Sequence, residues 1–357
     1  MNRREPGLWL GIVAGGGLAL AGLLCLGLVA WLFVGDGLPG RALATLPPPP
    51  ATAGGSALAT VAATVTASPP LASTPAATRP PSASPLPAAA TPAGEIVFVC
   101  FVEGVDQICR INADGSDYRQ LTFTTATDFY PEWGPERAQI IFSSRRSGEF
   151  NIYLMDAAGG NQRRISGDIG SLFAPAISPD GSQIAFTNAV GAYQNIWIMD
   201  ADGSNPHALT TGPYNEVDPA WSPDGTRLSF ASDRNGFVRH YVMEADGSNV
   251  RLLPDEVRLH GGRSDWSPDG RWLAFYAGPR DDRDIYLVAT DGSGEWRRLT
   301  DGGRNLAPSF SPDGQWIVFT SYREGEDAEL FIMRPDGSDV RQLTFNDYAD
   351  WQPRWGP

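Results

Sequence analysis

The stretch Asp218-Pro-Ala-Trp-Ser-Pro-Asp-Gly225 runs directly into Thr226-Arg-Leu-Ser-Phe230, so that two strand-like runs flank one tight turn. Pro223 presets the first corner of such a turn, because its ring fixes φ at about −65°. Gly225 supplies the left-handed conformation that lets the chain return. One turn of this kind is a weak signal. This turn recurs at a fixed spacing, so the period of the repeat decides the fold.

Three markers recur with a period of 44 or 45 residues. They are an apolar position held by Trp133, Ile177, Trp221, Trp266, Phe310 and Trp355, a phenylalanine at positions 98, 142, 186, 230, 275 and 319, and an Asp-Gly-Ser turn that begins at Asp114, Asp202, Asp246, Asp291 and Asp336. Each unit holds four short runs with alternating apolar residues between Asp-Gly turns, which is typical of antiparallel hairpins. Six units predict an all-β fold, a six-bladed β-propeller over residues 95–357.

The phase of the two ends predicts that the ring closes. The repeats begin at Glu95-Ile-Val-Phe98, which is the second strand of its unit, and end at Trp351-Gln-Pro-Arg-Trp355, which is a first strand. We therefore expect the last strand to complete the first blade. Closure of this kind removes the two exposed sheet edges that an open array would leave.

The repeat also carries a family resemblance. Trp-Ser-Pro-Asp-Gly, a Phe-containing strand, Asn195-Ile-Trp-Ile-Met199, the Asp-Gly-Ser turn and Arg341-Gln-Leu-Thr344 together resemble the WD-like repeat of the TolB propeller family. The resemblance covers all six repeats and implies the propeller fold. It implies function less narrowly, since similar blades occur in binding proteins and as accessory domains of serine peptidases. TolB-like proteins have a small α/β domain before the propeller, where this chain has an apolar segment and a linker.

The first 94 residues predict a membrane anchor and a linker. Residues 8–34 are uncharged and mostly apolar, long enough for a transmembrane helix, and Arg3 and Arg4 precede them. We expect residues 1–7 in the cytoplasm and the propeller outside it; a signal peptide cleaved near Ala42-Leu43-Ala44 is the alternative. Residues 35–94, with 13 prolines and almost no charge, are predicted to be a disordered linker that also resembles O-glycosylated stalks.

The charge balance favours some partners over others. The chain has 357 residues, no lysine and a formal net charge of −14 at pH 7, and beyond residue 94 it carries 23 Arg against 39 Asp and Glu. Because a domain this acidic repels phosphate backbones, we do not expect nucleic acid as a partner. It would attract cations or a basic protein surface, unless the charge serves solubility alone. We expect a monomer.

Polar residues of the first strand of each unit are the candidate binding residues. One, three and five positions before the Trp221-type residue, most units carry a polar side chain, and we expect this set to lie near a central channel. The candidates are Asp128, Glu132, Glu216, Asp218, Arg263, Asp265, Asn305, Asp350 and Arg354, with His260 at the channel mouth. They could bind a basic ligand or a divalent cation, or form mutually satisfied Asp–Arg pairs in a water-filled channel.

Other chemistry in the sequence is sparse. Cys100 and Cys109 lie on neighbouring strands of one hairpin. They could form a disulfide or remain two free thiols. The three histidines are scattered, no G-x-S-x-G elbow is present, and Asp200-Ala-Asp-Gly-Ser-Asn205 matches only half of an EF-hand loop. We therefore name no catalytic residue, no metal ligand and no cofactor, apart from the channel cation considered above.

The two faces of the ring are expected to differ in role. The Ser-Pro-Asp-Gly and Asp-Gly-Ser turns share one face and barely vary, whereas the loops on the other face do vary, as at Arg145-Arg-Ser-Gly148 and Tyr322-Arg-Glu-Gly325. Recognition usually lies in variable loops on a rigid scaffold. The sequence thus favours a membrane-anchored, extracytoplasmic propeller that binds a protein or cell-envelope component without catalysis. The alternatives are a channel-site lyase or hydrolase acting on glycans or peptides, and an anchored sensor.

Overall fold

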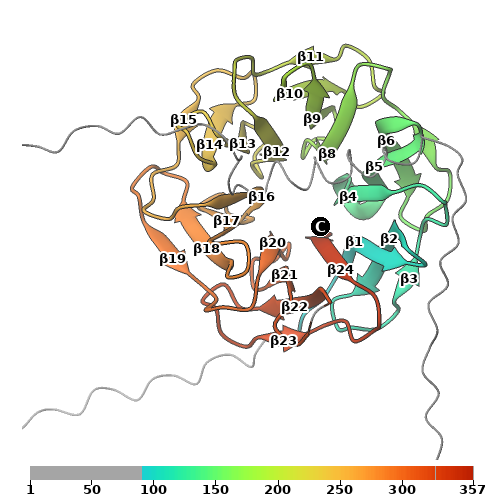
Figure 1. Cartoon of the computed structure of the whole chain (residues 1–357), viewed down its shortest axis with the longest axis vertical. Helices are drawn as coiled ribbons and strands as arrows, with labels where there is room; N and C mark the ends of the chain where they lie inside the picture. Colours follow the sequence, from blue (N-terminus) through green and yellow to red (C-terminus); the bar gives the residue numbers. More distant parts are fainter. Residues whose placement is uncertain (1–90, 326, 357) are drawn as a thin grey trace, which may run out of the picture. The chain divides into compact units, whose positions relative to one another are not determined.

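Six four-stranded antiparallel sheets surround a central axis, which confirms the predicted all-β six-bladed propeller (Figure 1). The computed structural model describes residues 91–325 and 327–356. The predicted membrane helix at 8–34 and nearly all of the predicted linker lie outside these residues, and no helix within them is long and apolar enough to span a bilayer. The strands β24, β4, β8, β12, β16 and β20 lie innermost in blades 1 to 6.

The strands follow the order that the repeat predicts. Blade 1 combines β24 (Asp350–Trp355) with β1 (Glu95–Val102), β2 (Val105–Asn112) and β3 (Arg119–Gln120). Blade 2 contains β4 (Asp128–Trp133), β5 (Gln139–Ser147), β6 (Glu149–Asp156) and β7 (Arg163–Arg164), and blade 3 contains β8 (Ser171–Ile177), β9 (Gln183–Val190), β10 (Tyr193–Asp200) and β11 (His207–Ala208). Blade 4 contains β12 (Glu216–Trp221), β13 (Arg227–Ser232), β14 (Arg239–Glu244) and β15 (Arg251–Leu252). Blade 5 contains β16 (His260–Trp266), β17 (Trp272–Ala277), β18 (Asp284–Ala289) and β19 (Trp296–Arg298), and blade 6 contains β20 (Leu306–Phe310), β21 (Ile317–Ser321), β22 (Glu329–Met333) and β23 (Arg341–Gln342).

The Ser-Pro-Asp-Gly turn forms the hairpin predicted for it. The N–H of Gly225 donates to the carbonyl oxygen of Ser222 at 2.9 Å, and Gly225 has a φ of 69°. The Ser222 hydroxyl and the Thr226 N–H both donate to Oδ1 of Asp224, at 2.6 and 3.0 Å. These bonds, led by that from Ser222, hold the pKa of Asp224 down at about 2. In blade 2 a short 3-10 helix, Pro135–Arg137, replaces this turn. The turn satisfies its own polar groups and serves as framework.

Each inner strand contains a bulge just before its Trp-type residue. In blade 4 the pairing of β12 with β13 shifts between Val217 and Ala220, and the bulged residue Asp218 has a φ of 54°. The N–H that the bulge frees donates to the Thr187 hydroxyl of blade 3 at 3.0 Å. Tyr130, Ala174, Ala307 and Gln352 take the same positive φ in their blades. A bulge adds one residue to a strand, so residues before it and after it face different ways.

Packing between blades uses the repeated aromatic residues. The recurring phenylalanines, such as Phe98 and Phe230, are fully buried. The indole N–H of Trp221 donates to the carbonyl oxygen of Ala176 in the preceding blade at 3.1 Å, and that of Trp266 donates to Ala220 at the same distance. Trp221 and Trp266 therefore seal their blades onto the preceding blade both by packing and by a hydrogen bond.

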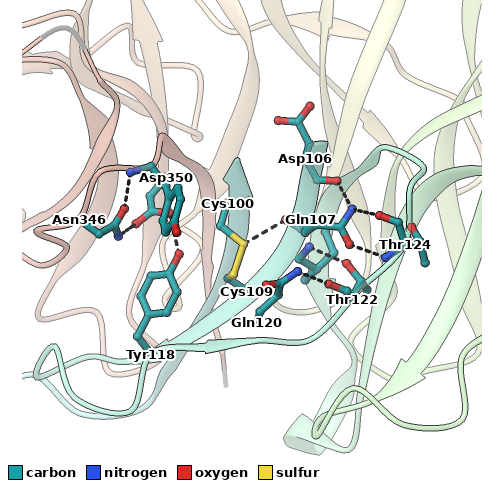
Figure 2. Close-up of a disulfide and its surroundings, with 12 residues drawn as sticks. Cys100, Asp106, Gln107, Cys109, Tyr118, Gln120, Thr122, Thr124, Asn346 and Asp350 are labelled. Carbon is teal, nitrogen blue, oxygen red and sulfur yellow. Dashed lines mark hydrogen bonds between the residues drawn. A yellow bond between two sulfur atoms is a disulfide. The ribbon is translucent and has the colours of Figure 1, made fainter. Parts of the chain in front are cut away.

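Blade 1 closes the ring as predicted. The C-terminal strand β24 pairs with β1, with Ile96 opposite Trp355 and Cys100 opposite Asp350. Cys100 and Cys109, on β1 and β2, form a disulfide with Cα atoms 5.8 Å apart (Figure 2). The closing blade thus joins the two ends of the described chain through one sheet and carries a covalent link within it.

Candidate functional site

Four predicted site residues meet at the axis of the propeller. Arg354 comes from β24, Glu132 from β4, Asp218 from β12 and Arg263 from β16, and all four line one central pocket. Nε of Arg354 donates to Oε2 of Glu132 at 2.7 Å. Nη2 of Arg354 also donates to the carbonyl oxygen of Ser264, at 3.0 Å. Arg354 therefore joins the closing strand to blade 2 through an ion pair and to blade 5 through a hydrogen bond.

The second arginine makes a similar link. Nη2 of Arg263 donates to the carbonyl oxygen of Pro131 at 2.9 Å, and its guanidinium lies 5.5 Å from the Tyr130 ring centre. Arg263 itself is 95 % buried, since its exposed fraction is 5 %. Oδ2 of Asp265, another predicted site residue, accepts the backbone N–H of Phe310 at 2.8 Å. The pocket between these groups has room for about one water molecule.

Burial governs the ionisation of this axial cluster. It raises the pKa of Asp218 to about 6, although the charges of Arg263 and Arg354 oppose the shift. It also raises the pKa of Glu132, again against both arginines. Burial and the neighbouring Arg354 charge lower the pKa of Arg263 to about 10. Asp218 therefore changes charge near neutral pH, and the cluster becomes more positive as pH falls.

Four other predicted residues do not line the axial pocket. Asp128, Glu216, Asn305 and Asp350, the residues five positions before the Trp site, are buried but do not line that pocket. Nη2 of Arg146 donates to Oδ2 of Asp128 at 2.9 Å, and Arg234 makes the equivalent ion pair with Glu216. The ion pairs of Asp128 and Glu216 join the inner strand of each blade to the next strand, at the end near the loops.

The arginines of these pairs were missed from the sequence. Arg146, Arg234 and Arg323 each follow the inner-strand acid or amide by 18 residues. Each guanidinium also lies over an aromatic ring, as Arg146 does over Tyr153 at 4.7 Å from the ring centre. A Ser-x-Arg triplet marks all three, at 144–146, 232–234 and 321–323. That repeated triplet could have identified these arginines from the sequence.

Asp350 departs from this pattern. Val102 stands two positions after Cys100, where the arginine stands in blades 2, 4 and 6. The Tyr118 hydroxyl donates to Oδ1 of Asp350 at 3.1 Å, and Nδ2 of Asn346 donates to Oδ2 at 2.8 Å (Figure 2). No cation within the described chain pairs with Asp350, and burial raises its pKa to about 7.

His260 lies at the start of β16, buried against His240 of β14. Their Nδ1 atoms are 3.0 Å apart, and Nε2 of His240 contacts the carbonyl oxygen of Gly262 at 3.2 Å. Nε2 of His260 contacts Oδ1 of Asp255 at 3.2 Å. Burial, with the His260 charge, lowers the pKa of His240 to about 3, so that it stays neutral. Across residues 91–356, apart from 326, no three His, Cys, Asp or Glu side chains gather as a metal site.

The fold and these repeats have a clear counterpart among known proteins. A family model described as "TolB beta propeller domain" matches residues 167–260 and 253–357, more than half of the chain. The chain belongs to the TolB β-propeller family. This TolB-family chain is 47 % identical over 94 residues to an uncharacterised protein of Agrobacterium fabrum, Atu1656, a match that covers 26 % of the chain and 31 % of the relative.

Two further relatives of the TolB-family chain are named. It is 42 % identical over 74 residues to an uncharacterised peptidase of Bacillus subtilis, YuxL, covering 20 % of the chain and 11 % of that protein. It is 36 % identical over 75 residues to the Tol-Pal system protein TolB of Geobacter sulfurreducens, covering 20 % of the chain and 17 % of that protein. The chain thus spans less than a third of the length of each of these relatives.

Solved structures agree on the fold. TolB from Acinetobacter baumannii superposes with a TM-score of 0.66 at 25 % identity, over 75 % of this chain and 68 % of that one. A chain of the nidogen/laminin complex superposes with a TM-score of 0.60 at 14 % identity, over 73 % of this chain and 97 % of that one. At that identity the likeness shows the architecture alone.

The two faces of this TolB-family propeller differ in exposed apolar surface. We call loop face the side that carries the second-to-third-strand loops and the connections from outer to next inner strand. Nine of the thirteen exposed large apolar side chains in the described part of the chain lie there: Phe101, Phe123, Val190, Tyr193, Tyr214, Phe237, Leu259, Phe345 and Tyr348. The other four, Tyr118, Val250, Trp296 and Val340, lie at the start of outer strands.

Proposed function

We propose that this chain is an extracytoplasmic binding module, anchored through residues 8–34, whose loop face docks a protein partner. The observation that carries this proposal is that most of the exposed large apolar side chains lie on the loop face. Phe123 and Phe345, exposed by 77 % and 75 %, follow the outer strands of blades 1 and 6 on that face. Aromatic side chains are enriched at protein interfaces, where their burial supplies most of the binding energy. The opposite face carries Asp-Gly turns that satisfy their own polar groups, such as the turn at Asp224.

Relatives named as Tol-Pal system proteins are in line with protein binding. One relative is named as a component of the Tol-Pal system, a name that implies assembly with other proteins. Other relatives are named as peptidases, and they are matched over only 6–11 % of their length. At the axis we retain Asp218 as the candidate for a basic group that reaches the pocket, because none of the described residues donates a hydrogen bond to its carboxylate. The same axial proposal extends to Glu132 and Arg263.

Site-specific photo-crosslinking in membranes tests this proposal. A photoreactive phenylalanine analogue replaces Phe123 or Phe345 in the full chain, and Gln315, exposed beside a turn of the other face, serves as the matched control position. We expect both loop-face positions to crosslink the same protein and the Gln315 position to crosslink none. Equal crosslinking from both faces, or none from either loop-face position, would contradict the proposal.

A further inference from the structure

Four of the exposed apolar side chains of the loop face lie around blade 1. Phe101 is near the end of β1, Phe123 follows β3, and Phe345 and Tyr348 lie in the connection from β23 to β24. Since β24 is the inner strand of blade 1, all three segments begin or end in strands of that blade. Large apolar side chains that gather in one place on a protein surface mark interaction sites. We call these four residues the aromatic patch.

Hydrogen bonds hold two of these segments against the hairpin of β1 and β2. The N–H of Phe101 donates to the carbonyl oxygen of Ala349 at 2.9 Å, so the connection from β23 to β24 lies beside the end of β1. Nε2 of Gln107, on β2, donates to the carbonyl oxygen of Thr124 at 3.0 Å, and the Thr124 N–H donates back to Oε1 at 3.0 Å (Figure 2). Thr124 directly follows Phe123. The segments that carry the aromatic patch are therefore neighbours around one hairpin.

A third anchor fixes the backbone on both sides of Phe345. The Thr344 hydroxyl and the Asn346 N–H both donate to the carboxylate of Glu329 on β22, the second of them at 3.3 Å. Phe345 lies between these two residues and is nevertheless mostly exposed. A surface whose backbone is already ordered loses less conformational entropy when a partner binds. The patch is thus prepared for binding.

The loops around the aromatic patch carry an excess of acidic residues. Residues 101–106, 121–127, 322–328 and 344–349 together hold six Asp and Glu and one Arg. The exposed acids of the described part of these loops are Glu103, Glu324, Asp327 and Asp347. The arginine is Arg323, and it is engaged, because Nη2 donates to Oδ1 of Asn305 at 2.9 Å and Nε donates to the Ser321 hydroxyl at 3.0 Å. The aromatic patch therefore lies among negative charges.

Loops elsewhere on the same face are balanced or basic. Residues 233–238 of blade 4 and 278–283 of blade 5 together hold three Arg and three Asp. Residues 145–148 of blade 2 hold two Arg and no acid. Negative charge that served solubility alone would not need to gather beside exposed aromatic rings. Its concentration at blades 6 and 1 indicates the charge of a binding partner.

We infer that the aromatic patch and its acids bind a basic segment of the protein partner, in which arginine or lysine side chains alternate with large apolar ones. The inference rests on the proposed function and deepens it. Apolar side chains of the segment cover the rings, and their burial supplies the affinity. The basic groups pair with acids such as Glu103 and Asp347, or lie on ring faces, which attract cations. The same negative charges repel an acidic segment and an anionic lipid surface.

Defined peptides test this assignment on the full chain in a non-ionic detergent. Three fluorescein-labelled hexapeptides are compared by anisotropy: alternating arginine and tryptophan, alternating arginine and serine, and alternating glutamate and tryptophan. We expect the first to bind at least roughly tenfold more tightly than either other peptide, because only it matches both the rings and the charge. Raising the salt from about 50 to about 300 mM should weaken it. Equal binding of the arginine–serine or the glutamate–tryptophan peptide would overturn the assignment.

Paired variants place the binding on this surface. Glu103→Gln with Asp347→Asn should weaken the arginine–tryptophan peptide by roughly tenfold. The control pair, Asp202→Asn with Asp246→Asn, removes the same net charge from exposed turns of the other face and should leave binding within about twofold. Equal weakening by both pairs would mean that net charge alone attracts the peptide, and the assignment would then fail.

A second comparison tests the contribution of the rings. Phe345→Ser should weaken the arginine–tryptophan peptide by roughly fivefold. Val340→Ser changes an exposed apolar side chain outside the loop face and should have no effect. A Phe345→Ser variant that binds as the parent does would show that the rings take no part.

Crosslinks from Phe123 and Phe345 in membranes separate this inference from the proposed function. Mass spectrometry of the crosslinked product identifies the occupant, and we expect a basic segment of another protein. A neutral or acidic segment of another protein would defeat the inference and leave the docking function standing. A lipid or a second copy of this chain would defeat both. Peptide binding as predicted, with no protein crosslinked from either position, would count against the proposed function instead.

Discussion

Asp350 is a buried carboxyl group that its neighbours do not neutralise. Its counterparts Asp128 and Glu216 are ion-paired with arginines, whereas Asp350 has Tyr118 and Asn346 as partners and Glu329 as a nearby like charge. Burial is the main cause that raises its pKa to about 7, and Glu329 adds to it. The folded protein therefore holds a proton that the unfolded chain releases near pH 4.

This proton predicts a pH-dependent stability. Because the folded pKa is the higher one, the free energy of unfolding falls as pH rises from about 4 to about 7. Asp350→Asn mimics the protonated form, so the variant should be more stable than the parent at pH 8, by up to about 4 kcal/mol, and nearly equal to it at pH 4. Urea unfolding at both pH values measures this difference.

The matched control is Asp224, because its pKa is lowered in the folded protein instead of raised. Asp224 has a pKa held down at about 2 by Ser222, so its contribution is constant above pH 5 and is lost only as pH falls from about 4 to 2. Asp224→Asn should change stability by the same amount at pH 5 and pH 8. A variant Asp350→Asn whose effect is likewise the same at pH 5 and pH 8 would show that Asp350 is ionised throughout that range.

The inner strand and the strand next to it are held together by buried acid–arginine pairs. Glu216 is 2 % and Arg234 is 23 % exposed at the side chain, and Arg234 also lies 4.8 Å from the centre of the Tyr241 ring. Removing one member of a buried pair leaves an uncompensated charge, which costs about 3–5 kcal/mol. Replacing both members with apolar or neutral groups avoids that penalty.

A double-mutant cycle on this pair makes the argument testable. Arg234→Met alone should lower the free energy of unfolding by about 3 kcal/mol, and Glu216→Gln with Arg234→Met should recover at least half of that loss. Chemical unfolding of the three variants and the parent provides the numbers. Strictly additive losses would mean that the two side chains do not stabilise one another.

The Cys100–Cys109 bond links β1 and β2, the two strands of one hairpin. The two residues are nine apart in sequence, and closing so short a loop stabilises by about 2–3 kcal/mol. Cys100→Ala with Cys109→Ala should therefore lower the free energy of unfolding by that amount. Reductant should destabilise the parent to the same degree and leave the double variant unaffected; a parent insensitive to reductant would indicate that the bond is not formed in solution.

At the scale of the whole chain, the predicted membrane helix determines how the protein can be extracted from membranes. If residues 8–34 span the bilayer, the protein stays in the pellet after a wash at pH 11. Protease added outside the cytoplasmic membrane should then digest the propeller. A mature protein that begins near Ala44 and washes off would replace the retained anchor with a cleaved signal. Immunoblotting and N-terminal sequencing distinguish the two outcomes.

The sequence predicted the architecture well because the repeat is expressed in side chains that all six blades need. Pro223, Gly225 and Trp221 act within one blade or one blade junction, so their period counts the blades and gives the phase of closure. The pairing of β24 with β1, which closes the ring, could be predicted from the positions of the two ends within the repeat.

The site was harder to predict because strict alternation fails along the inner strands. Asp218 and Glu216 are two apart, so a regular strand would place both on the axis side. The bulge between Val217 and Ala220 breaks that alternation, and Glu216 turns into the blade while Asp218 lines the axis.

Closure in blade 1 also decides where mechanical load enters the molecule. A pull on the chain ahead of Glu95 is carried along β1, which is hydrogen-bonded to β24 on one side and to β2 on the other. These bonds lie across the direction of pulling, so they resist together rather than breaking one after another. The Cys100–Cys109 link passes part of the tension to β2 through covalent bonds. If residues 8–34 anchor the chain, the blade that closes the ring is therefore also the blade through which the propeller is held.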